Sequence, residues 1–130
     1  MRQFLARIAI VVDSYDRALE FYIMLGFTIV EDTELGPTKR WVVIAPPGAI
    51  ETDCKILLAE AGNEQQRNSI GNQTGGRVFL FLYTDDFWRD YNRYTELGVE
   101  FLRPPALEVY GTVAVFKDIY GNLWDLIQPK

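Results

Sequence analysis

The sequence predicts an α+β fold made of two βαβββ modules. The order strand, helix, strand, strand, strand occurs twice along the 130 residues. The residues that begin and end the two helices repeat at one spacing, because Asp13 and Asp85, like Gly26 and Gly98, lie 72 positions apart. A duplicated supersecondary unit is the natural explanation of such a repeat.

The first module is expected over residues 1–59. A helix over 15–25 begins after Asp13 or Ser14, since short polar side chains cap helix N-termini, and it ends at Gly26 as a C-cap. Apolar, β-branched runs predict the strands of this module. These strands are expected at 4–12, 27–31, 40–45 and 54–59.

A polar, glycine-rich stretch over 60–76 predicts a linker or loop. The second module is expected over 77–130, with a helix that begins at Asp85 or Asp86 and ends at Gly98. Its last two strands form a hairpin around the turn 118–122, because Gly121 and Asn122 are typical turn residues between apolar runs. The earlier strands of this module are expected at 77–84 and 99–102.

Charge and composition exclude several classes of function. The net charge of −5 and the pI of about 4.7 argue against nucleic acid or an anionic membrane as the main partner. The single cysteine, Cys54, cannot form an intramolecular disulfide and favours a reducing compartment, so we expect a cytoplasmic protein. The chain has no histidine, the commonest metal ligand and the commonest general base near neutral pH.

The chain resembles the vicinal oxygen chelate superfamily, which includes glyoxalase I, extradiol dioxygenases and the bleomycin-resistance proteins. The resemblance covers nearly the whole chain outside the linker. It rests on short sequence motifs in both modules. These are Val12-Asp13, Asp16 to Tyr22 and Leu25-Gly26-Phe27 in the first module, and Thr84-Asp85-Asp86, Leu97-Gly98-Val99, Phe116-Lys117-Asp118 and Gly121 to Leu126 in the second.

This resemblance implies curled mixed sheets around a cavity, and a homodimer. In some relatives the cavity holds a divalent metal ion. The implied ligand positions carry Arg7, either Ile56 or Leu57, Phe79 and Asp125. Only Asp125 can ligate a cation, whereas metal sites need three or four deprotonated ligands. We therefore expect no metal ion and no other cofactor.

Strand alternation predicts which side chains line the cavity. Phe79 and Phe81 are expected to point inward from one strand, and Asp125 from another. Arg7 and Asp125 allow two interpretations: they pair with each other across the lost metal site, or they bind a ligand. Trp41 and Tyr110 are the candidates for capping the pocket.

These expectations lead to a metal-free protein that binds a small organic molecule in an aromatic cavity. The predicted ligand-binding residues are Arg7, Trp41, Phe79, Phe81, Tyr110 and Asp125. The resemblance to the bleomycin-resistance branch implies a cationic, planar ligand, which aromatic side chains hold by cation–π contacts. The alternative is a glyoxalase-like lyase, isomerase or dioxygenase that uses a divalent metal ion, or Asp125 as acid or base.

Overall fold

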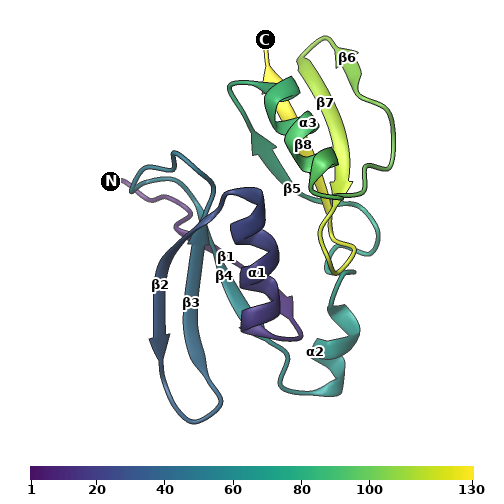
Figure 1. The fold of residues 1–130 in the computed structure, drawn as a ribbon. Coiled ribbons are helices and arrows are strands. Elements are labelled where there is room, and N and C mark those ends of the chain that lie inside the picture. Colours follow the sequence, from purple (N-terminus) through teal and green to yellow (C-terminus); the bar gives the residue numbers. More distant parts are fainter. The chain divides into compact units, whose positions relative to one another are not determined.

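The computed structural model describes residues 1–130 as two units, residues 1–70 and residues 71–130. Each unit is a four-stranded mixed sheet with a helix packed on one face (Figure 1). The predicted order strand, helix, strand, strand, strand is confirmed in both units. The sheets are not closed into barrels.

The first unit contains five elements of the expected kind and one additional helix. The elements run in the order β1 (Arg7–Val12), α1 (Tyr15–Leu25), β2 (Thr28–Glu34), β3 (Arg40–Ala45), β4 (Lys55–Glu60) and α2 (Glu64–Ser69). The sheet order is β1-β4-β3-β2, in which β1 runs parallel to β4 and the other neighbours are antiparallel.

Helix α1 has the predicted bounds because both of its caps act as expected. The Ser14 side chain accepts a hydrogen bond from the backbone N–H of Arg17 at the N-terminus. Gly26 adopts a left-handed backbone with φ of 107° at the C-terminus, which glycine does without steric cost. The buried side of the sheet beneath α1 carries Ile10 and Val12 from β1 and Leu58 from β4. Ile10 and Val12 lie two residues apart, so they share one face of β1.

The segment expected to be a linker contains the short helix α2. Asn63 caps it, since its side chain accepts a hydrogen bond from the backbone N–H of Gln66 at 2.8 Å. The sequence pattern did not predict this helix, because α2 buries none of its side chains and therefore shows no apolar periodicity.

The second unit repeats the architecture of the first. It consists of β5 (Val78–Tyr83), α3 (Phe87–Glu96), β6 (Ala106–Glu108), β7 (Gly111–Lys117) and β8 (Leu123–Pro129), with the sheet order β5-β8-β7-β6. Its core lies between α3 and the sheet. There the ring of Phe116 stacks on Trp124 with centroids 5.8 Å apart and meets Tyr94 edge-on.

The strand expected over residues 99–102 is wrong. This stretch forms a single β-bridge, between Phe101 and Phe116, and the second strand of this unit is instead β6. Pro104 and Pro105 explain the difference, because proline has no backbone N–H to donate to a ladder and pairing resumes only at Ala106. None of the three helices is long and apolar enough to cross a membrane.

Candidate functional site

Asp125 occupies the middle of the sheet face that α3 leaves uncovered. It lies on β8, an interior strand, opposite Phe81 on the parallel strand β5 and opposite Val115 on the antiparallel strand β7. Its neighbours Trp124 and Leu126 are buried on the other face. Strand alternation therefore turns the Asp125 side chain away from the helix.

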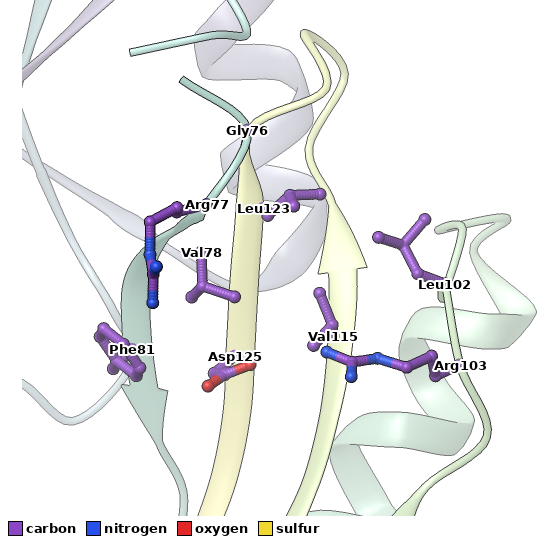
Figure 2. Close-up of a pocket in the computed structure, with 9 residues that line it drawn as sticks. All are labelled: Gly76, Arg77, Val78, Phe81, Leu102, Arg103, Val115, Leu123 and Asp125. Atoms are coloured by element: carbon purple, nitrogen blue, oxygen red, sulfur yellow. The ribbon is translucent and has the colours of Figure 1, made fainter. Parts of the chain in front are cut away.

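A hollow of about 620 Å³ surrounds this carboxylate. Figure 2 shows Asp125 at the centre, with Arg77 beside Val78 on one side and Arg103 reaching across Val115 from the other. The remaining walls are apolar or backbone. The hollow is lined by Gly76, Arg77, Val78, Phe81, Leu102, Arg103, Val115, Leu123 and Asp125.

The Asp125 carboxylate makes no hydrogen bond and no salt bridge within its own unit. Partial burial raises the pKa of Asp125, because desolvation penalises the charged form, while the nearby positive charge of Arg103 lowers the pKa and partly offsets this effect. The site thus holds a carboxylate that the protein does not neutralise by direct contact.

A smaller hollow of about 170 Å³ adjoins the first and shares four of its lining residues. It extends toward Tyr110, whose side chain is 58% exposed, and toward Glu108. The shared residues are Val78, Arg103, Val115 and Asp125. Three predicted site residues, Phe81, Tyr110 and Asp125, therefore lie around this one region of the second unit.

Trp41 lies in the first unit, in a separate hollow of about 540 Å³. Tyr15, Arg40 and Glu60 also line this hollow. The Arg40 guanidinium is held by Asp16 at 2.8 Å and by Asp32 at 2.7 Å, and its hydrogen bond to Asp32, together with its positive charge, lowers the pKa of Asp32. Arg40 is therefore already engaged in the structure of this unit.

Arg7 and Phe79 do not line these hollows. Arg7 begins β1 and is exposed, opposite Lys55 on β4. Its pairing with Asp125 stays a hypothesis, since the two residues belong to different units. Phe79 lies at a register shift between β5 and β8, and Val78 lines the hollow beside it.

The sequence interpretation missed Arg103, Leu102, Val78 and Val115 as lining residues. The alternation of β7 identifies Val115, because it lies two residues from Val113 and opposite Asp125. Arg103 carries no comparable signal, since it lies in an irregular segment between Phe101 and Pro104 whose direction no periodicity fixes.

A sequence model of the Glyoxalase/Bleomycin resistance protein/Dioxygenase superfamily matches residues 4–126. The chain belongs to this superfamily. An uncharacterized protein of Shewanella frigidimarina (strain NCIMB 400) is 55% identical to it over 130 residues, covering 98% of this chain and 95% of the relative.

Two solved structures of similar length share the fold of this superfamily member. The crystal structure of UcmS2 matches with a TM-score of 0.83 and 29% identity, covering 98% of each chain. TnmS3, an antibiotic binding protein from Streptomyces sp. CB03234, matches with a TM-score of 0.75 and 28% identity, covering 100% of this chain and 98% of that chain.

The metal-ligand positions that the superfamily resemblance implies do not fit a divalent cation in this chain. The strand pairing places Leu57 opposite Ala9, as it places Asp125 opposite Phe81, so Leu57 rather than Ile56 is the counterpart of Asp125. Asp125 is then the single oxygen donor among the four positions. No group of three or more Asp, Glu, Cys or His side chains comes together that could hold a metal ion.

Proposed function

We propose that this protein binds a small organic molecule in the hollow around Asp125, Phe81 and Val115, without a metal ion and without transforming the molecule. The hollow itself is the observation that carries the proposal. Its volume of about 620 Å³ falls in the usual range of ligand pockets, roughly 300–1,000 Å³. An apolar lining with a few charged groups is also the usual composition of such a site.

Family membership supports binding rather than any one reaction, because the same fold serves many chemistries. The similarity to TnmS3, an antibiotic binding protein, supports a small organic ligand. The donor chemistry supports a metal-free site, since Asp125 stands alone where three or four ligands are needed.

The proposal includes a homodimer in which a second copy helps to cover the uncovered sheet faces. Phe81 and Tyr83 are 61% and 67% exposed on the face of the second unit that carries Asp125. Apolar area of this kind favours association, because burying it removes it from water. Light scattering after size-exclusion chromatography tests this part, and a monomer at micromolar concentration would contradict it. A cytoplasmic location is consistent with the exposed, unpaired thiol of Cys54.

The experiment for the binding function is a thermal-shift screen of small aromatic and polycyclic molecules. A ligand that binds the folded protein raises its melting temperature. Compounds that raise the melting temperature are then incubated with the protein and recovered for mass spectrometry. We expect the increase in melting temperature to be lost in Val115→Arg, a change that fills the hollow. We also expect the compound to be recovered unchanged. The absence of any hollow-dependent binder would contradict the proposal.

The metal-free part has its own measurement, which is the metal content of protein purified without chelator and soaked in Ni²⁺, Zn²⁺, Mn²⁺ and Fe²⁺. We expect less than about a tenth of an ion per chain, because one carboxylate does not hold such ions against buffer. Near-stoichiometric metal that is lost in Asp125→Asn would overturn this part and favour a metal-dependent enzyme.

One observation favours a second candidate, a metal-free enzyme with Asp125 as acid or base. Burial raises the pKa of Asp125, and perturbed carboxyls often serve in proton transfer. The same mass-spectrometric assay separates the two candidates. A product that appears with wild type and disappears with Asp125→Asn would establish the enzyme.

A further inference from the structure

We infer that the hollow around Asp125 takes an aromatic molecule carrying an acidic group, and that Arg77 and Arg103 hold that group. This inference rests on the proposed binding function and names the chemical class of the ligand. It departs from the cationic ligand that the bleomycin-resistance resemblance implies.

The charge of the hollow differs in sign from the charge of the chain. The whole protein carries −5, but the lining of the larger hollow holds two arginines against one carboxylate. A ligand at short range responds to the charges that face it, since more distant surface charges are screened by water and salt. Glu108 lines only the adjoining smaller hollow. The larger hollow therefore favours an anionic group on the ligand.

The side chains of Arg77 and Arg103 do not take part in the polar contacts that stabilise their unit. Neither side chain makes a hydrogen bond or salt bridge there. Arg89, on the helix of the same unit, differs because it contacts Asp85 and Asp90, each at 2.9 Å. Both guanidinium groups at the hollow thus keep their full set of donors for a ligand.

The two arginines approach the hollow from opposite sides. Figure 2 shows Arg77 beside Val78 and above Phe81, while Arg103 reaches inward over Val115. A guanidinium group binds the two oxygens of a carboxylate or sulfonate through parallel hydrogen bonds. The apolar body of the ligand would then lie against the aromatic ring of Phe81 and against aliphatic lining residues such as Val115 and Leu123.

Asp125 lies between these arginines and limits how deeply the acidic group enters. Its carboxylate is close enough to Arg103 to feel its charge, yet no salt bridge forms between them. An anionic group near Asp125 is therefore repelled when Asp125 is ionised. Removing this charge strengthens the binding of an acidic ligand and leaves a neutral ligand unaffected.

Three fluorescent probes test the inference on the full-length chain. 8-Anilinonaphthalene-1-sulfonate is anionic, and N-phenyl-1-naphthylamine is the same scaffold without the sulfonate. The third probe, 9-aminoacridine, is a planar cation. We expect the sulfonate to bind wild type more tightly than either of the other two.

The variants test whether the two arginines at the hollow are responsible. In the double variant Arg77→Gln/Arg103→Gln we expect at least about tenfold weaker binding of the sulfonate, because each lost charge-assisted contact corresponds to roughly this factor. The neutral probe should change less than about twofold. Asp125→Asn should strengthen only the sulfonate. Arg67→Gln removes one positive charge from an exposed position on α2, away from the hollow, and should change nothing.

The possible failures are distinguishable. Equal affinity for the sulfonate and the neutral probe, unaltered in the double variant, would overturn the acidic ligand while leaving small-molecule binding intact. Preference for 9-aminoacridine would overturn it in favour of a cation. If no probe binds, the proposed function of this hollow fails as well. The variant Arg77→Lys/Arg103→Lys keeps the charges and should keep the preference, which separates a lost contact from misfolding.

Discussion

Phe81 and Asp125 lie directly opposite each other on the parallel strands β5 and β8, and both face the side of the sheet that has no helix. The corresponding pair in the first unit is Ala9 and Leu57, on β1 and β4. The same place in a duplicated sheet thus carries an aromatic ring and a carboxylate in one unit and two aliphatic side chains in the other.

We expect Asp125→Asn to stabilise the free protein at pH 7 by less than about 1 kcal/mol, because it removes a partly buried charge that has no direct partner but is still screened by solvent. The raised pKa fixes the sign of the pH dependence. The stability that this carboxyl contributes is fully present below its pKa in the unfolded chain. This stability is lost as the pH rises through its pKa in the folded protein.

Urea unfolding of wild type and Asp125→Asn between pH 3 and pH 7.5 checks this expectation. The difference in the free energy of unfolding should grow toward neutral pH. Glu34→Gln, on the exposed strand β2, is the matched control and should show little change. A neutral variant that is less stable than wild type at pH 7 would show that Asp125 has a partner.

Asp118 holds the turn between β7 and β8, and Asp118→Ala should cost about 3 kcal/mol. Its Oδ1 accepts hydrogen bonds from the backbone N–H groups of Tyr120, at 2.9 Å, and Asn122, at 3.0 Å, while its Oδ2 accepts one from the Asn122 side chain at 2.9 Å. Asp118 is buried, so water replaces these contacts poorly. Thermal unfolding measures the loss. Asp85→Ala, at an exposed carboxylate, should differ little from wild type.

Gly71 and Gly75 allow steric contact to be separated from backbone strain. Both have positive φ, 76° and 69°, but a Cβ at Gly71 would collide with the carbonyl oxygen of Tyr120, whereas a Cβ at Gly75 meets nothing within 4 Å. We expect Gly75→Ala to cost about 1 kcal/mol and Gly71→Ala at least about 3 kcal/mol. Equal melting temperatures for the two variants would rule out close packing of Gly71 against the 118–122 turn.

Tyr94 makes the stability of the protein sensitive to alkaline pH. Burial between α3 and the sheet, together with the negative charge of Asp90, raises the pKa of Tyr94 from 10.0 to about 12. A raised pKa means that this stability is fully present below the unfolded pKa and is lost as the pH rises through the folded pKa. The free energy of unfolding should be about 1 kcal/mol lower at pH 11 than at pH 9 on this account.

The variant Tyr94→Phe should lose this alkaline dependence, and urea unfolding at the two pH values measures it. Tyr110→Phe, at an exposed tyrosine, should retain it. The expectation fails if Tyr94→Phe and wild type lose equal stability between pH 9 and pH 11.

The sequence was sufficient for most of the fold because short-range chemistry sets most of the boundaries. Ser14 and Gly26 delimit α1, and the turn from Asp118 to Asn122 delimits the last hairpin. Strand alternation likewise separates Trp124 and Leu126 from Asp125. Each of these features depends on residues that are close together in the sequence, so one amino-acid sequence is enough to predict them.

The site was less predictable because it depends on irregular backbone. The register shift between β5 and β8 brings Val78, not Phe79, to the wall of the hollow. No residue type in the sequence predicts a register shift of this kind. Arg103 reaches the hollow from a segment interrupted by prolines. Membership of the superfamily does not supply such details, since they arise from local departures from the shared pattern.

The contrast between Ala9–Leu57 and Phe81–Asp125 suggests how recognition can change in a duplicated chain. Substitutions at the second pair can alter what is recognised while the first unit stays unchanged. Directed evolution of new ligand preferences is therefore best begun at Phe81 and Asp125.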